Sequence, residues 1–494
     1  LSEVTAKTLD DWIMRNLQPS TDFCRQVKET VKQICEFLKR DCFGRNIYVL
    51  KTVKGGSAGK GTALQNNSDA DVVLFLNCFS SYQQQNQDRD HILELIKQRL
   101  RDCNKSLFTV NVTEPRYKGP KNTSRSLSLT LWKSNESIDV DILPAYDALG
   151  QVKKDAAPDE EVYVKLLDIN PSPGEFSPCF TELQKKFVKR HPAKLKNLLR
   201  LVKYWYKELL KPRYPNASLP PKYALELLTI YAWEEGTDSS NQFDTAAGFR
   251  TVLELLRRHQ EICIYWETYY SLQHSRLGAR VGKLLGKTCP VILDPADPTG
   301  ILGQGKEWDL MAQAAANHLL LPCIRSAQAW NVQPSRSVTI EVKRLVSTSL
   351  IMTVSPSTTV RKLKENIQEE WDIPWFNQRL ALLKTDIILE DSETLATHGI
   401  FCNTTLVLLQ IEPQAMQIFV KDEKNRSTTY TVKPTHTVRQ LKEQVKKELH
   451  VPVDQQRLTY CSKELQDHHM LAHYNIQPLS TIFLLLRLRG GTNP

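Results

Sequence analysis

The sequence predicts a mixed α+β protein in which two lobes are followed by two small tandem modules. Three observations support this: alternating apolar residues over 44–150, helical apolar spacing over 180–290, and an internal repeat near the C-terminus. The 494 residues, 41% of them hydrophobic, fit about three to five domains and exclude a disordered chain. Apolar runs stay far below the ~18 residues of a membrane span, so we expect no membrane association.

We place the strand-rich lobe at 1–155 and the helical lobe at 156–335. The first lobe shows a helical pattern at Asp90–Cys103 and four strand-like runs: Ile47–Val53, Asp71–Leu76, Leu127–Leu131 and Ser137–Leu143. The second lobe repeats apolar residues at helical spacing, at Leu195, Leu198, Leu199, Val202, Tyr206, Leu209 and Leu210. A functional site is expected in the cleft between the lobes.

The tandem modules are defined by a repeat with an offset of 78 residues. Thr359–Lys364 recurs as Thr437–Lys442, and Gln378–Leu380 recurs as Gln456–Leu458. Each module reads as two strands, a helix and further strands, with Thr437 as the N-cap of the second helix. This order predicts a sheet with a helix across one face.

Residues 416–491 resemble ubiquitin over the whole module without a gap. The matching segments are Met416–Lys421, Pro452, Asp454–Leu458, Tyr474–Gln477 and Leu486–Gly491. Residues 336–412 are similar to a more diverged copy. The resemblance implies two β-grasp ubiquitin-like domains at 336–412 and 416–491.

A Gly-Gly-Ser turn follows the first strand of the first lobe. Glycine lets the backbone close on a phosphate, and helix-start N–H groups stabilise it, so Gly56 and Ser57 are candidate nucleotide-binding residues. The segment from Gly55 to Lys60 lacks the spacing of a P-loop. Taken alone, the segment is more typical of a flexible Gly-rich turn than of a phosphate site.

Two pairs of aspartates favour the interpretation of this turn as part of a nucleotide site. Asp69 and Asp71 precede an apolar strand run, and a period of two puts both carboxylates on one face. Asp139 and Asp141 alternate with apolar residues on a second strand in the same way. Carboxylates from neighbouring strands suit two magnesium ions, one activating an attacking hydroxyl and one neutralising a triphosphate.

The pattern of Gly-Gly-Ser, Asp-x-Asp and a distant strand aspartate resembles the polymerase-β-like nucleotidyltransferase superfamily. Further segments narrow the resemblance to the 2′-5′-oligoadenylate synthetase family: Val53–Phe75, Asp141–Leu149, Phe180–Gln184, Leu195–Tyr206, Tyr223–Glu234 and Val291–Thr299. The implied fold is a bilobal nucleotidyltransferase.

The resemblance implies an ATP-consuming enzyme that makes 2′-5′-linked oligoadenylates in innate antiviral defence. It makes Asp69, Asp71 and Asp141 the catalytic residues and the ligands of two Mg²⁺ ions, with Asp141 activating the acceptor hydroxyl. The nucleotide contacts it implies are Arg200, Lys203 and, where the family usually has Gln, Lys222. Asp139 is expected to be an outer neighbour.

A concentrated basic stretch favours a polyanionic partner. Residues 185–213 carry eleven Lys and Arg against the single acid Glu208, which equals the +10 of the whole chain. The resemblance implies activation by double-stranded RNA, whose phosphates are contacted by Lys39, Lys54, Lys60, Lys185, Lys189 and Lys194. Any one of these lysines could equally be part of a solvated face.

Eleven cysteines without a C-x-x-C pair fit a reducing compartment, so we expect a cytoplasmic protein. The family's tetramer-forming Cys-Phe-Lys segment corresponds to Cys323–Arg325, with two residues changed, which favours a monomer. Asp294 and Asp297 each directly precede a proline, so we expect both to form turns.

The ubiquitin-like modules are expected to dock partner proteins, such as ubiquitin-binding antiviral signalling proteins. The positions of ubiquitin's apolar patch hold Glu423, Thr459 and Leu485, so generic ubiquitin receptors should bind poorly. Conjugation would require removal of the residues after Gly491. The alternative hypothesis for the whole chain is a non-catalytic RNA-binding scaffold that acts through these modules.

Overall fold

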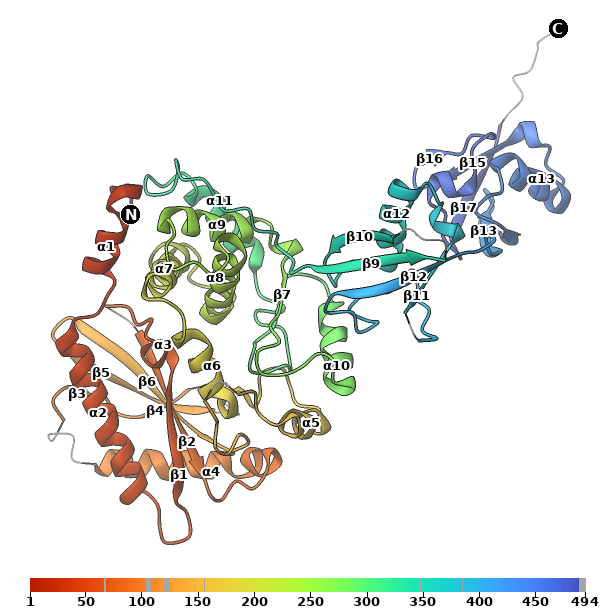
Figure 1. Ribbon diagram of the computed structural model, residues 1–494. Coiled ribbons are helices and arrows are strands. Elements are labelled where there is room, and N and C mark those ends of the chain that lie inside the picture. The colour runs from red at the N-terminus through yellow and green to blue at the C-terminus, as the bar shows by residue number, and fades with distance from the viewer. Residues whose placement is uncertain are drawn as a thin grey trace. The chain divides into compact units, whose positions relative to one another are not determined.

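The computed structural model describes residues 1–65, 68–103, 108–118, 125–154, 156–345, 349–383 and 385–487. The chain forms two compact units (Figure 1). Unit 1 comprises Leu1–Val338 with Val354–Ser357 and Thr394–Phe401, and unit 2 comprises Thr339–Thr353, Thr358–Glu393 and Cys402–Pro494. The fold is mixed α+β, as predicted.

Unit 1 begins with helix α1 (Leu9–Asn16) and a mixed sheet that, within the described residues, has six strands in the order β1-β2-β6-β5-β3, with β4 beside β5. The strands are β1 (Val49–Gly55), β2 (Ser68–Leu76), β3 (Asn111–Val112), β4 (Arg116–Lys118), β5 (Ser126–Lys133) and β6 (Glu136–Ala145). The central pair, β2 and β6, is parallel, and β1 and β5 flank it in antiparallel fashion.

Helices α2 (Thr21–Arg40) and α4 (Tyr82–Asp102) supply side chains to a core that buries one face of this sheet. The predicted alternation is confirmed, because Ile138, Val140 and Ile142 are all buried in that core. Helix α4 begins earlier than the predicted Asp90, since Ser81 caps it and its first turns are too polar to show an apolar period.

The opposite face of β2 turns toward the helical part of unit 1. Val73 and Phe75 belong to the core that the helices share. Asp69 and Asp71 have the same phase along the strand, so both aspartates also face the helical part.

The helical part surrounds a large apolar core that includes the predicted positions Leu195, Leu198, Leu199 and Val202. Its elements are α5 (Glu160–Asp168), α6 (Thr181–Lys189), α7 (Ala193–Tyr204), α8 (Lys222–Thr237), α9 (Thr245–Arg257), α10 (Ser275–Leu285), α11 (Trp308–His318) and the short pair β7 (Cys263–Ile264) and β8 (Val291–Ile292). Helix α7 continues directly into a π-helical turn, Trp205–Leu210. No helix in the described part of the chain has the length and apolar character needed to cross a bilayer.

The tandem modules are two ubiquitin-like folds. The first is built from β9 (Val338–Arg344), β10 (Ser349–Val354), α12 (Val360–Trp371), β11 (Gln378–Leu382) and β12 (Thr404–Gln410). The second is built from β13 (Met416–Lys421), β14 (Ser427–Val432), α13 (Val438–Leu449), β15 (Gln456–Tyr460), β16 (Lys463–Glu464) and β17 (Thr481–Leu486). The predicted Gly490–Gly491 terminus lies outside the described residues.

Side-chain contacts repeat between the modules along with the sequence. Thr359 caps α12, and Thr437 caps α13 as predicted. In the first module Gln378 donates to the carbonyls of Lys364 and Ile373, and in the second Gln456 donates to those of Lys442 and Val451. The repeat therefore preserves the internal bonds that hold the helix to the sheet.

Candidate active site

The Gly-Gly-Ser turn joins β1 to the short helix α3 (Gly56–Lys60) and packs directly on β2. Gly56 has φ +66°, and a Cβ there would lie 2.9 Å from the carbonyl oxygen of Asp69 and the amide nitrogen of Asp71. Only glycine permits so close an approach in this conformation. Ser57 fastens the turn, since its hydroxyl donates to Asp69 Oδ1 at 2.8 Å and accepts from the Asp69 amide at 3.1 Å.

The strand register brings the predicted aspartates together. Asp71 pairs with Asp141 and Asp69 with Asp139 across the parallel strands β2 and β6, so all four start from the same face. Asp139 turns toward β5, where its Oδ1 accepts a hydrogen bond from Thr130 at 2.6 Å. Asp141 is the most enclosed of the three proposed metal ligands, with 9% of the residue exposed.

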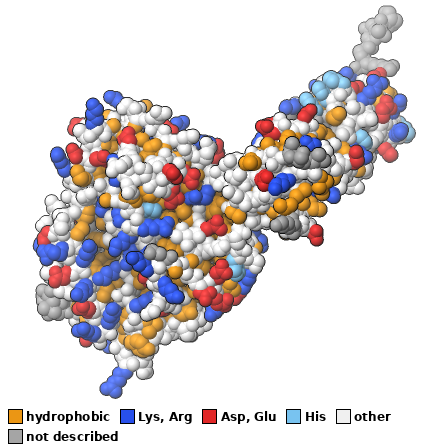
Figure 2. Space-filling model, in the orientation of Figure 1, with side chains coloured by type: hydrophobic (Ala, Val, Ile, Leu, Met, Phe, Trp, Pro, Cys, Tyr) orange, Lys and Arg blue, Asp and Glu red, His pale blue; other side chains and the backbone are white. Residues whose placement is uncertain are grey.

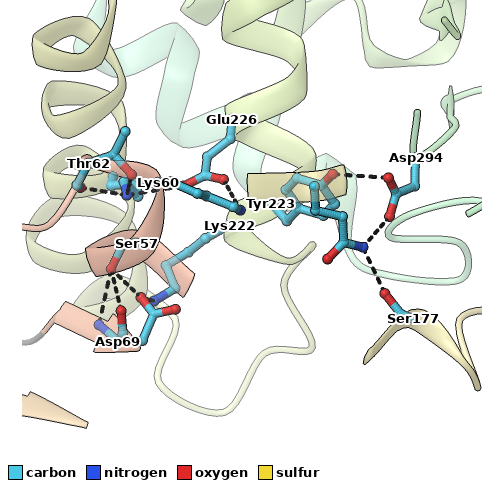
Figure 3. Close-up of polar contacts among 11 residues, drawn as sticks. Ser57, Lys60, Thr62, Asp69, Ser177, Lys222, Tyr223, Glu226 and Asp294 are labelled. Atoms are coloured by element: carbon cyan, nitrogen blue, oxygen red, sulfur yellow. Dashed lines mark hydrogen bonds and ion pairs between the residues drawn. The ribbon is translucent and has the colours of Figure 1, made fainter. Parts of the chain in front are cut away.

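Carboxylate oxygens are the donors that magnesium prefers, so Asp69, Asp71 and Asp141 suit it by chemistry. In the described part of the chain, however, no group of three or more His, Cys, Asp or Glu side chains is arranged to hold a metal ion. Asp69 is engaged within the protein, because Lys222 Nζ lies 3.5 Å from its Oδ1 (Figure 3). The backbone register is thus in place, whereas the side chains are not gathered around a cation.

Lysines dominate the electrostatics of this site. Burial acts to raise the pKa of Asp69, but the ammonium groups of Lys222 and Lys203 and the hydrogen bond from Ser57 hold it well below its ordinary value. Asp69 therefore carries a full negative charge. A site with this much positive charge is suited to a polyphosphate.

A buried ion cluster joins α3 to the helical part of unit 1. Glu226 of α8 receives Lys60 Nζ on Oε2 at 2.7 Å and Lys203 Nζ on Oε1 at 3.1 Å. Burial would raise the pKa of Glu226, but the two ammonium groups lower it overall. The predicted RNA contact Lys60 is therefore turned inward, with 12% of its side chain exposed.

The loop after α3 is held by helix α7. Arg200 donates to the carbonyls of Gly61 at 2.8 Å and Ala63 at 2.9 Å, and Lys203 donates to the Thr62 hydroxyl at 2.8 Å. Both predicted nucleotide contacts thus lie beside the turn and the aspartates. In the described state they bind the protein's own backbone.

The other predicted RNA contacts form a basic surface with one outlier. Lys185 of α6 is flanked by Lys54 and Lys189, whose charges together with burial lower its pKa. Lys39 and Lys54 both lie close enough to the buried Cys35 for their charges to act on its thiol. Figure 2 shows Lys and Arg side chains gathered on the viewer's side of unit 1.

Lys194 stands apart from that surface. Its ammonium is 3.7 Å from Asp10 and lies over the ring of Phe243 at 5.3 Å. Lys196 instead joins the surface, since it donates to the carbonyl of Lys189 at 2.7 Å.

Two residues near the aspartates were missed by the sequence analysis as site components. Glu226 could have been suspected because it is a lone acid within the apolar run Ala224–Trp233. Lys207, which the sequence analysis counted only within the basic stretch 185–213, lies in the π-helical turn. Burial and the charge of Lys222 lower the pKa of Lys207 to about 8, and π-helical turns occur frequently at functional sites.

The second ubiquitin-like module exposes apolar side chains on β17, including positions outside the three considered above. Phe483 lies opposite Thr459 in the sheet and is 49% exposed, and Leu485 is 40% exposed. Glu423 Oε1 accepts a hydrogen bond from the Leu486 amide of β17 at 3.0 Å. The patch is therefore shifted along β17 relative to the one that the sequence analysis considered.

Family models match four segments of the chain. Residues 30–121 match the nucleotidyltransferase domain, and residues 156–339 match 2′-5′-oligoadenylate synthetase 1, domain 2, C-terminus. Residues 338–412 and 418–489 each match the ubiquitin family.

Individual relatives match over the same architecture. The 2′-5′-oligoadenylate synthase-like protein 2 of Mus musculus is 39% identical over 97% of each chain, and protein 1 of that name and species is 36% identical over 98% of this chain and 97% of the relative. The 2′-5′-oligoadenylate synthase 2 of Homo sapiens is 43% identical over 67% of this chain and 47% of its own length. With a nucleotidyltransferase domain, the synthetase C-terminal domain and two ubiquitin-like domains, the chain belongs to the family of 2′-5′-oligoadenylate synthase-like proteins.

Proposed function

We propose that this protein is a double-stranded-RNA-activated, magnesium-dependent nucleotidyltransferase that joins ATP into 2′-5′-linked oligoadenylates and releases pyrophosphate. The observation that carries the proposal is the register of β2 and β6, which sets Asp71 opposite Asp141 and leaves Asp69 on the same face beside the Gly-Gly-Ser turn. Relatives named as 2′-5′-oligoadenylate synthases support it through the nucleotidyltransferase part of the chain.

The protein's own groups would divide the work as follows. Asp69, Asp71 and Asp141 would hold two Mg²⁺ ions, which when bound lower the pKa of the acceptor hydroxyl and neutralise the triphosphate. Ser57 and the backbone at Gly56 would bind phosphate oxygens of the donor ATP. Arg200, Lys203 and Lys222 would orient the two nucleotides by charge.

The reaction balances with one proton transfer. The 2′-oxygen of the acceptor attacks the α-phosphorus of the donor, a P–O bond forms, and the bond to the β-phosphate breaks with its electron pair leaving on pyrophosphate. Asp141, the most enclosed of the three aspartates, accepts the hydroxyl proton. The basic surroundings stabilise the charge that builds up on the leaving group.

In the described state the strands that carry the aspartates are in register, but Asp69 is paired with Lys222. This fits an enzyme that requires an activator. Lys222 competes with a cation for Asp69, since its ammonium lies 3.5 Å from Oδ1 of that carboxylate. RNA bound along Lys39, Lys54, Lys185 and Lys189 would stabilise the assembled state and shift the population toward it.

The decisive assay incubates the full chain with ATP and Mg²⁺, with and without duplex RNA, and measures oligomers that resist a 3′-5′-specific nuclease. We expect RNA-dependent product from the wild type. Asp71→Asn should abolish that product with an unchanged RNA affinity. A wild type that makes no product at saturating RNA would overturn the proposal.

The second candidate function is a non-catalytic RNA-binding scaffold. It is favoured by the contacts of Asp69 with Lys222 and Ser57, which already engage that carboxylate. RNA binding without product, together with capture of signalling proteins by the ubiquitin-like domains, would establish this function instead.

We also propose a cytoplasmic monomer whose ubiquitin-like domains dock ubiquitin-binding or antiviral signalling proteins. In the segment that corresponds to the family's tetramer contact, Cys323 and Ile324 are fully buried, so they are not available to a second subunit. Arg250 holds the backbone there by donating to the carbonyl of Ile324. Sedimentation at micromolar concentration tests the monomer, and a concentration-dependent tetramer would contradict it.

A further inference from the structure

Asp294 lies in the loop after β8, where it is 4% exposed and accepts three hydrogen bonds. Its Oδ1 accepts from Tyr223 Oη at 3.0 Å and from the Ala296 amide at 2.9 Å. Its Oδ2 accepts from Gln184 Nε2 at 2.6 Å. The bond to Ala296 confirms the predicted turn, but the other two bonds exceed what a turn requires.

The two side-chain donors to Asp294 come from two helices, one beside the basic surface and one beside the aspartates. Gln184 belongs to α6 and directly precedes Lys185 of the basic surface; its amide also donates to Ser177 at 2.8 Å. Tyr223 belongs to the first turn of α8, directly after Lys222, whose ammonium contacts Asp69. Figure 3 shows Tyr223 between the ion cluster and Asp294.

Tyr223 also contacts the ion cluster through its ring. Lys60 Nζ lies 4.2 Å from the ring centroid, in the range of a cation–π interaction, while the same ammonium binds Glu226. Any displacement of the Tyr223 side chain therefore changes the surroundings of Lys60 as well as the first turn of α8.

A buried carboxylate has few tolerable arrangements, because each lost donor leaves a charge unsatisfied. Burial and the neighbouring Asp297 raise the pKa of Asp294 to about 7, whereas its three hydrogen bonds act to lower that pKa. The three donors thus offset part of the cost of burying the carboxylate. Gln184 and Tyr223 are accordingly held at a fixed separation.

We infer that Asp294 is a positioning residue that couples the RNA-facing helix α6 to the first turn of α8, and through it to Lys222 and Lys60 at the aspartates. This inference rests on the proposed function in taking RNA as the ligand of the basic surface. A shift of α6 on RNA binding would move Gln184, and Asp294 would transmit that shift to Tyr223.

Asp294→Asn is the direct test, because an amide keeps the size of the side chain but replaces an acceptor with a donor that faces Gln184 or Tyr223. Asp297→Asn is the matched control. Asp297 is equally buried in the same loop, but its carboxylate accepts from the amide and hydroxyl of Thr299, within its own turn. Removing its charge lowers the pKa of Asp294, which keeps its carboxylate and all three donors. Tyr223→Phe removes a single donor and serves as a milder second variant.

Three quantities are measured on each full-length chain: affinity for a labelled duplex RNA, hydrogen–deuterium exchange of residues 222–228 with and without that RNA, and RNA-stimulated product formation. In the wild type we expect RNA to change the exchange of residues 222–228. In Asp294→Asn we expect RNA affinity within twofold of the wild type, loss of that exchange change, and at least a tenfold drop in RNA stimulation. Asp297→Asn should stay within twofold on all three.

The outcomes separate this inference from the proposed function. The wild type could make no product and still show an RNA-dependent change in exchange at residues 222–228 that Asp294→Asn loses. That result would overturn the proposed synthetase activity and support the coupling through Asp294. The coupling is overturned if RNA leaves exchange at 222–228 unchanged in the wild type, if RNA does not bind, or if Asp294→Asn and Asp297→Asn behave alike. The coupling is also overturned if Tyr223→Phe and Asp294→Asn each keep the RNA-dependent change in exchange at residues 222–228.

Discussion

At the scale of single residues, the site is governed by how lysines share a small number of carboxylates. Asp69 receives Lys222 and Ser57, and Glu226 receives Lys60 and Lys203. The two Glu226 pairs are deeply buried and are therefore sensitive to the loss of one partner, because the remaining charge has little water to solvate it. The Lys222–Asp69 pair is more exposed. These residues therefore connect stability and function directly.

Glu226→Gln tests the ion cluster. Removing the carboxylate leaves two buried ammonium groups without a counter-charge, so we expect the free energy of unfolding to fall by about 3 kcal/mol. Urea unfolding followed by tryptophan fluorescence measures it. The control is Glu254→Gln, which breaks the partly exposed pair with Arg250 and should cost less than about 0.5 kcal/mol; equal losses in both variants would contradict the assignment.

Lys222→Gln tests the competition for Asp69. Without the ammonium, the Asp69 carboxylate is free to take up a cation, so affinity for Mn²⁺ should rise several-fold when followed by electron paramagnetic resonance. Asp69→Asn, which removes the ligand itself, should weaken binding. Unchanged or weaker Mn²⁺ binding by Lys222→Gln would show that Lys222 does not guard the site.

At the scale of elements, the junctions between helices place the site. Helices α6 and α7 meet at His191, whose ring contacts Phe187 of α6 and Trp233 of α8 edge to face at 5.7 and 5.3 Å. The ring is buried, and its Nε2 has no hydrogen-bond partner among the residues that the structure describes. A neutral imidazole suits this apolar junction, whereas a charged one would be uncompensated.

This junction predicts acid sensitivity. Burial lowers the pKa of His191 from 6.5 to about 4, so its stabilising contribution is complete above pH 6.5 and is lost as the pH falls toward 4. His191→Phe keeps the aromatic contacts and should reduce the loss of unfolding free energy between pH 7.5 and 5 by about 2 kcal/mol. Exposed His91→Phe should retain the wild-type pH profile; a flattened profile in both variants would refute the role of His191.

At the scale of the whole molecule, the sequence predicted which faces are apolar but not which charged groups meet. Alternation at Ile138 and Val140 and the 78-residue offset were enough to predict the sheet and the tandem modules. The pair of Lys60 with Glu226 joins residues far apart in the chain, and periodicity carries no information on such partners. For the same reason Asp294 was read only as a turn residue.

The salt dependence of RNA binding by the full chain tests how many phosphates the basic surface contacts. Phosphate contacts release counterions, so the logarithm of the RNA association constant should fall steeply and linearly with the logarithm of salt concentration. Lys189→Gln should reduce that slope by about 1. The control is exposed Lys447→Gln in the second ubiquitin-like domain, which removes the same charge and should leave the slope unchanged; an equal reduction would assign the effect to net charge alone.

Catalysis by this site requires that the three aspartates form a cation site once Lys222 withdraws. Anomalous diffraction from crystals of the full chain with duplex RNA, Mn²⁺ and a non-hydrolysable ATP analogue tests this directly. We predict anomalous peaks about 2.2 Å from carboxylate oxygens of Asp69, Asp71 and Asp141, with Lys222 moved away from Asp69. Crystals that contain RNA and nucleotide but no peak among these aspartates, with Lys222 still beside Asp69, would contradict the account.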